Sequence, residues 1–169
     1  PATYLFYPGV YTFTPVAPSE YVNVNTKTVA VLDGVHGGTA YYADAADVSL
    51  EATYSDKLKE AALESAKEFI NSCASIPGNQ NSDCPSALSS DAVSAISVKT
   101  MPTTLEPMDM DPGVFQGQVT FAVTYSDKSY MPGTRDVDAS VVVNVQFAND
   151  GTLKLTPKGT PDFWVGTSR

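Results

Sequence analysis

Residues 137–147 read VDASVVVNVQF and decide the fold of this 169-residue chain. Apolar side chains occupy every second position from Val137 to Phe147, and the positions between them are mostly polar. Because successive side chains of a β-strand point to opposite faces of a sheet, alternation of this length predicts a half-buried strand.

Three further stretches around this strand show a strand-like pattern. Residues 92–101 and 114–125 precede it, and residues 152–156 follow it. Asn149-Asp150-Gly151 predicts a hairpin turn between the long strand and the last one. We therefore expect a four-strand antiparallel meander.

One amphipathic helix is predicted upstream of the meander. Ser55 is a favourable N-cap residue, and Asp56 places an acid in the first turn, where the helix dipole favours negative charge. Pro77-Gly78 ends the helical pattern. The expected apolar stripe consists of Leu58, Ala62, Ala66, Phe69, Ile70 and Cys73. This stripe should pack on the apolar face of the meander.

Short strand-like runs broken by glycine fill the N-terminal part of the chain. They predict a small β-sandwich-like module over residues 1–53, followed by a helix-plus-antiparallel-sheet domain over residues 54–169. The fold class predicted from these patterns is α+β. One helix on a four-strand meander corresponds to a cystatin-like or nuclear-transport-factor-like layout.

Composition excludes several classes of protein. Hydrophobic residues make up 43% of the chain and charged residues 17%, the balance of a folded domain rather than a disordered one. The net charge of −9 argues against nucleic acid and anionic lipid as partners. The chain begins at Pro1 and holds no apolar run that could span a membrane, so we expect any membrane anchor to lie upstream of it.

The two cysteines, Cys73 and Cys84, flank a polar loop directly after the predicted helix. A pair in this position is typical of a local disulfide in an oxidising compartment. The alternative is two unpaired thiols in a cytoplasmic protein. A CxxC redox motif is absent, and two cysteines with the single histidine fall short of a four-ligand zinc site.

Four short motifs carry a resemblance to a known group of proteins. They are YPGVYTF at residues 7–13, VSLEATY at residues 48–54, Cys73-Ala74-Ser75 and Cys84-Pro85. Over about residues 5–90 the chain resembles the extracytoplasmic C-terminal regions of actinobacterial single-pass membrane-anchored proteins of uncharacterised function. The resemblance implies export, a disulfide between Cys73 and Cys84, and no enzymatic activity. This chain departs from the group in lacking the anchor and in its acidic, Asn-rich loop between the cysteines.

The sequence nominates no catalytic constellation. His36 is the only histidine, and nothing around it suggests an orienting partner or a nucleophile, so it is interpreted as an exposed loop residue. Glu60, Glu64 and Glu68 share a helix face with lysines around them and are interpreted as a solvated face. We therefore predict no enzyme and no cofactor.

A weak calcium site is the one metal hypothesis. Glu106, Asp109 and Asp111 lie in a short acidic segment, and carboxylates with backbone carbonyls are the ligands that calcium prefers. The segment lacks the glycine and the terminal glutamate of an EF-hand loop. The alternative is an acidic turn that joins two strands.

These observations favour a non-catalytic extracytoplasmic binding or sensory domain of a cell-envelope protein, with an unknown envelope ligand or protein as its partner. The alternatives are a structural spacer or protein-interaction module of the envelope, and a small enzyme on a cone-shaped α+β scaffold. A ligand-binding domain predicts polar residues inside an apolar concave face. A structural module predicts a filled core and an exposed apolar edge.

Overall fold

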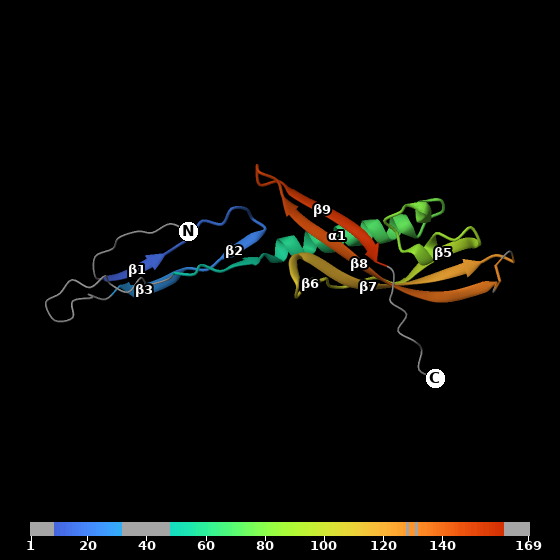
Figure 1. Cartoon of the computed structure of the whole chain (residues 1–169), viewed down its shortest axis with the longest axis horizontal. Helices are drawn as coiled ribbons and strands as arrows, with labels where there is room; N and C mark the ends of the chain where they lie inside the picture. Colours follow the sequence, from blue (N-terminus) through green and yellow to red (C-terminus); the bar gives the residue numbers. More distant parts are fainter. Residues whose placement is uncertain (1–8, 32–47, 128, 131, 161–169) are drawn as a thin grey trace, which may run out of the picture. The chain divides into compact units, whose positions relative to one another are not determined.

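The computed structural model describes residues 9–31, 48–127, 129–130 and 132–160 (Figure 1). The chain divides into two compact units, Pro1–Asp56 and Lys57–Arg169, called unit 1 and unit 2 below. Among the described residues all paired strands are antiparallel and one long helix accompanies them, so the chain is an α+β protein as predicted.

Unit 1 contains two separate two-stranded sheets in its described residues, β1 with β3 and β2 with β4. Residues 1–8 and 32–47 of the β-sandwich-like module predicted for residues 1–53 lie outside the described residues, so the sandwich stays a prediction. The strands are β1 (Gly9–Phe13), β2 (Val22–Val24), β3 (Lys27–Val31) and β4 (Ala52–Tyr54).

Ser55 is the one buried residue in the described part of unit 1. Its hydroxyl donates to the Glu20 carbonyl at 2.9 Å, and its N–H donates to the Tyr21 carbonyl at 3.0 Å. These bonds hold the residue that precedes the helix against the turn before β2.

The sheet of unit 2 has the strand order β5-β7-β8-β9, with β6 paired to β7 as well. β5, β7, β8 and β9 correspond to the four predicted strands, in the predicted order. The strands are β5 (Val93–Thr100), β6 (Glu106–Met108), β7 (Asp111–Tyr125), β8 (Gly133–Phe147) and β9 (Leu153–Thr160).

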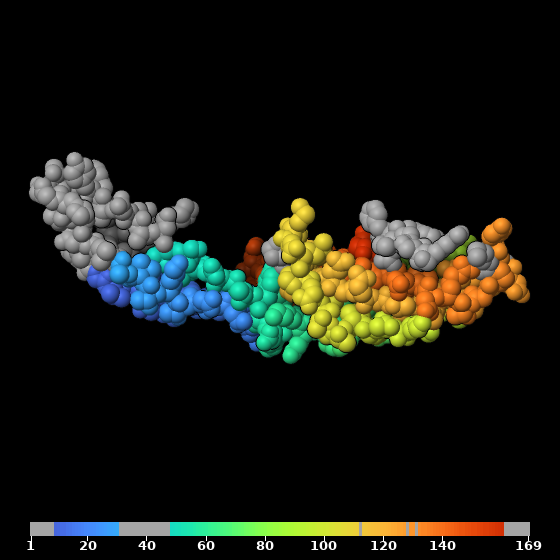
Figure 2. All heavy atoms as spheres, turned by 90° about the horizontal axis from the view of Figure 1, so that it is seen from below, coloured from blue at the N-terminus to red at the C-terminus, as the bar shows by residue number. Residues whose placement is uncertain are grey.

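The four-strand prediction missed β6, so the sheet has five strands. Asp109 and Met110 form a tight turn that folds β6 back onto the first residues of β7. This hairpin is the yellow projection in Figure 2. A strand this short, with Pro107 at its centre, carries no alternation that the sequence could reveal.

Helix α1 (Asp56–Cys73) lies along the sheet of unit 2 (Figure 1) and begins directly after Ser55, as predicted. Its buried residues recur at steps of three and four, whereas Phe69 of the predicted stripe is only half-buried. The buried stripe is Leu58, Ala62, Ala66, Ile70 and Cys73. The sheet face opposite this stripe buries Phe115, Val119, Phe121, Val123, Ala139, Val141 and Val143. The apolar face is therefore a filled core.

The segment between β5 and β6 adds Pro102 and Leu105 to this core. They reach it by crossing Gly117 of β7, where a Cβ atom would lie 2.5 Å from Leu105 Cδ2 and 3.0 Å from Pro102 Cβ. Glycine at this position leaves the space that the crossing occupies.

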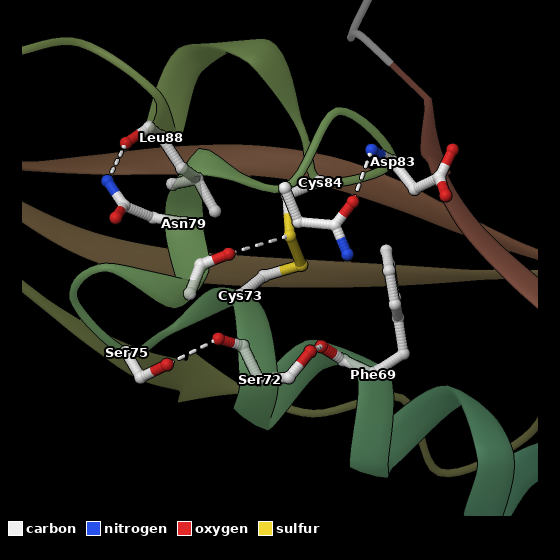
Figure 3. The surroundings of a disulfide bond; sticks show 10 residues. Phe69, Ser72, Cys73, Ser75, Asn79, Asp83, Cys84 and Leu88 are labelled. Atoms are coloured by element: carbon white, nitrogen blue, oxygen red, sulfur yellow. Dashed lines mark hydrogen bonds between the residues drawn. A yellow bond between two sulfur atoms is a disulfide. The ribbon is translucent and has the colours of Figure 1, made fainter.

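The predicted disulfide between Cys73 and Cys84 is confirmed, with a Cα–Cα distance of 5.7 Å (Figure 3). It joins the last residue of α1 to a loop that contains two short 3-10 helices, η1 (Gly78–Gln80) and η2 (Ser86–Leu88). Leu88 is fully buried, and the Asn79 side-chain amide donates to its carbonyl at 2.6 Å. The loop is thus part of the core.

The two neighbours of Cys84 dock this loop on the outer edge of β9. The Gly159 N–H donates to the Asp83 carbonyl at 2.7 Å. Pro85 lies directly over Gly159, so that a Cβ atom there would be 2.5 Å from Pro85 Cδ. We call this contact the edge cap.

Replacing Gly159 with alanine should lower the free energy of unfolding by ~1–3 kcal/mol through overpacking. The new Cβ would also meet the Pro85 backbone nitrogen at 2.7 Å, which cannot rotate away. Urea unfolding followed by circular dichroism measures the loss. Gly113→Ala is the matched control, because its Cβ would first meet a carboxylate oxygen of Asp111 at 3.3 Å. Equal losses in the two variants would contradict the edge cap.

Replacing both Cys73 and Cys84 with alanine should cost about 3 kcal/mol of stability, the loop-entropy value for a short ring. The same unfolding experiment under non-reducing conditions gives this difference. Wild-type protein in a reducing agent should unfold at a similar urea concentration to the double variant. An unchanged midpoint in both samples would show that the bond does not stabilise the loop.

Candidate functional site

The sheet face that points away from α1 is polar, and we call it the open face. Because β7, β8 and β9 pair without a register shift, its members are fixed by alternation. They are Val114, Gln116, Gln118, Thr120, Ala122 and Thr124 of β7, Thr134, Asp136, Asp138, Ser140, Val142, Asn144 and Gln146 of β8, and Lys154, Thr156, Lys158 and Thr160 of β9.

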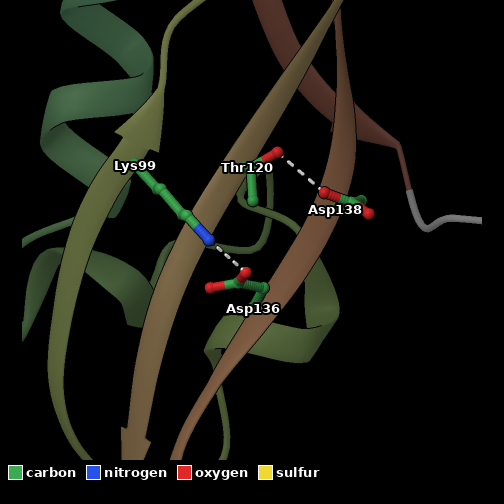
Figure 4. Close-up of polar contacts among 4 residues, drawn as sticks. All are labelled: Lys99, Thr120, Asp136 and Asp138. Atoms are coloured by element: carbon green, nitrogen blue, oxygen red, sulfur yellow. Dashed lines mark hydrogen bonds and ion pairs between the residues drawn. The ribbon is translucent and has the colours of Figure 1, made fainter.

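Side chains on the open face are hydrogen-bonded to one another across the strands. The directly opposite pairs are Gln118 Nε2 to Ser140 Oγ at 2.9 Å, Thr120 Oγ1 to Asp138 Oδ1 at 2.7 Å, and Thr124 Oγ1 with Thr134 Oγ1 at 2.8 Å. Lys99 of β5 adds an ion pair with Asp136 (Figure 4). We call this set the polar ladder.

The polar ladder orients side chains more than it stabilises the fold. The side chains of Lys99 and Asp136 are 56% and 51% exposed, and such surface pairs contribute at most ~1 kcal/mol. Ser140 is the one member that is buried, at 7% exposure. Amide, hydroxyl and carboxylate groups in fixed positions on an accessible face are suited to hydrogen-bonding a ligand.

A hollow of about 510 Å³ lies beside the β6–β7 hairpin. Gln116 and Gln118 belong both to its lining and to the open face, so the two surfaces are continuous. The lining is Glu106, Pro107, Met108, Asp109, Met110, Gln116, Gly117 and Gln118. Met110 is 98% exposed, so the rim combines thioethers with carboxylates and amides.

The structure does not gather the predicted calcium ligands into a metal site. Glu106 lies in β6 opposite Gln116, Asp109 lies in the turn, and Asp111 accepts a hydrogen bond from the Gly113 N–H at 3.1 Å. Among the described residues, no group of three or more histidine, cysteine, aspartate or glutamate side chains could hold a metal ion. The segment is a hairpin, and its acids are exposed.

The glutamates of the predicted helix face lie on α1, apart from the open face. Glu64 forms an ion pair with Lys67 at 2.7 Å on the surface of α1, as a solvated helix face requires. His36 lies outside the described residues.

An apolar patch at the β8–β9 hairpin is the second surface feature of unit 2. Val145 lies opposite Leu155, and Phe147 lies opposite Leu153, on the same sheet face as the core. Phe147 is 39% exposed and the other three are half-buried. The alternation of residues 137–147 correctly predicts that these side chains share one face, but that face is only partly covered at this end of the strand. We call these four residues the hairpin patch.

The turn of this hairpin carries a perturbed carboxyl group. The backbone N–H of Thr152 donates to Asp150 Oδ1 at 2.9 Å, and this bond, with the Thr152 hydroxyl, lowers the pKa of Asp150. The group is fully exposed. The turn is thus held best at pH values where the carboxyl is ionised.

No family model, curated protein or solved structure matches the chain. In the part of the chain that the structure describes, no helix is long and apolar enough to cross a membrane.

Proposed function

We propose that this chain is a non-catalytic extracytoplasmic binding or sensory domain of a cell-envelope protein, and that the open face with the adjoining hollow is its ligand surface. The observation that carries this proposal is the polar ladder, whose Gln118 end runs into the hollow. The polar ladder offers hydrogen-bond donors and acceptors in fixed orientations. The hollow lies at the Gln118 end of the ladder and offers space for part of a ligand.

The chemistry of this surface suits a ligand rich in hydroxyl and amide groups. Thr120, Thr124, Gln116 and Gln118 offer neutral groups, and the Lys99–Asp136 pair neutralises its own charges. Soluble fragments of an envelope glycan or its peptides have these properties. The filled core behind the face keeps the strands rigid, which reduces the ordering cost of binding.

The layout that we propose is cystatin-like or nuclear-transport-factor-like, with one helix across an antiparallel sheet. In such a layout the first place to look for a ligand is between the helix and the concave sheet face. Here Phe115, Phe121 and the α1 stripe occupy that space, so the proposal uses the opposite face.

The two cysteines support the proposal of an extracytoplasmic compartment. Cys73 and Cys84 are buried and disulfide-bonded, and such bonds persist in oxidising compartments. Together with the resemblance to envelope proteins, this supports export. We propose that the full-length protein is anchored in the cell envelope through a segment N-terminal to this chain.

A protein-interaction module of the envelope is the second candidate. The filled core and the hairpin patch both favour it, because a structural module predicts this combination, and half-exposed apolar side chains in register on two strands are typical of contact surfaces. The two candidates use opposite faces of the same sheet and can be separated by substitution.

The ligand proposal predicts that soluble glycan and stem-peptide fragments of bacterial envelopes raise the thermal midpoint of the chain. A fragment at 100 times its dissociation constant should add ~2.7 kcal/mol to stability. The double substitution Gln118→Ala and Asp138→Ala should weaken binding by about tenfold, ~1.4 kcal/mol, by removing two ladder groups. Thermal shift followed by calorimetry of any hit makes both measurements.

Glu64→Ala with Glu68→Ala on the exposed surface of α1 is the matched control and should leave the affinity unchanged. A panel without any shift would contradict the ligand proposal. Equal weakening by the control and the ladder variants would place binding away from the open face.

A further inference from the structure

β9 is an edge strand whose outer backbone groups can be assigned individually. The Gly159 N–H points outward, because it donates to Asp83 in the edge cap. Backbone groups of a strand alternate between its two sides, so Pro157, Leu155 and Leu153 also direct their polar groups outward.

The edge cap divides this outer edge into a closed half and an open half. In the closed half the Gly159 donor is already used, and Pro157 has no N–H to offer. In the open half Leu153 and Leu155 each present an N–H and a carbonyl. No strand among the described residues pairs with that side of β9.

We propose that a second copy of this chain pairs with the open half of β9, antiparallel and in a register centred on Leu155. In this register Leu155 exchanges backbone hydrogen bonds with Leu155 of the second copy. The Leu153 N–H of each copy donates to the Pro157 carbonyl of the other. In this register Pro157 only has to accept a hydrogen bond. The N–H groups of Leu153 and Leu155 therefore both have a carbonyl partner.

Other registers fit the edge less well. If the pair were centred on Pro157, the Pro157 residues of the two copies would face each other without an N–H between them. Leu155 of each copy would then face Gly159 of the other, whose N–H is already bonded in the edge cap. Centring it on Leu153 would oppose Leu155 to Gly151, which lies in the hairpin turn at φ +82°. The length of the open half therefore selects one register.

Side chains on both sheet faces are compatible with this pairing. On the core side, Leu155 meets Leu155 of the second copy and Leu153 lies opposite Pro157, so each hairpin patch extends into a shared apolar surface. On the open face Lys154 opposes Thr156, so the lysines that usually protect an edge do not face each other. The contact is isologous, as a two-fold dimer requires.

The pairing is tested on the full chain by sedimentation velocity, from low to high micromolar concentration. The wild type should form a dimer in a concentration-dependent way. Thr156→Lys places two like-charge contacts with Lys154 in the dimer and should weaken it by about tenfold. Thr156→Glu places opposite charges there and should strengthen it by a similar factor.

Ser97→Lys and Ser97→Glu are the matched controls, because they make the same charge changes on β5 at the other edge of the sheet. They should leave dimerisation unchanged. A wild type that stays monomeric throughout the range, or Thr156 variants that shift association in the same direction, would overturn the proposal. This test involves no open-face ligand, so it is independent of the proposed function.

Hydrogen exchange gives a second readout that does not need variants. Protection of the Leu153 and Leu155 amides should rise with protein concentration, whereas protection of the Gly159 amide, already bonded to Asp83, should not change. Dimer formation without added protection at Leu153 and Leu155 would place the interface elsewhere and overturn the register.

Discussion

The structure of unit 2 depends on one packing constraint, the contact between the α1 stripe and the apolar face of β7 and β8. Leu58 and Ile70 from the helix and Phe115 and Phe121 from the sheet are almost completely buried. A buried side chain of this size contributes roughly 1.5–3 kcal/mol, whereas an exposed ion pair such as Lys99–Asp136 contributes at most about 1 kcal/mol. Apolar packing therefore fixes which sheet face is covered, and the strand alternation then leaves a polar face accessible.

The disulfide-closed loop has a role beyond stabilising the end of α1. Asp83 and Pro85, on either side of Cys84, contact Gly159 and close part of the β9 edge. Unprotected edges pair readily with other strands, and Pro157 adds a second block next to the first. The cap therefore limits how much of β9 can accept another strand, and the hairpin patch lies beside the part that remains open.

Periodicity made the helix and the long strands predictable from the sequence, because each element buries one face at its own repeat. The three-residue strand β6 is too short to show a repeat, and its hairpin separates the acids that suggested calcium. The alternation also could not show how much of each face is covered, so the exposure of Phe147 was missed. In the sequence, the residues of the polar ladder appear only as the polar positions of the strand alternation. Any solvated strand can carry Gln, Thr, Asp and Ser at such positions, so these residues do not distinguish the ladder from an ordinary polar face.

One face of the sheet is a filled core, and the other is an accessible polar surface. Paramagnetic relaxation by a soluble gadolinium chelate tests this arrangement directly on isotope-labelled protein. We expect strong relaxation of the side-chain amides of Gln116, Gln118 and Asn144, and protection of the methyl groups of Val119, Val141 and Val143. Equal protection on the two faces would mean that the open face is covered, and relaxation of the valine methyl groups would mean that α1 does not pack on the sheet.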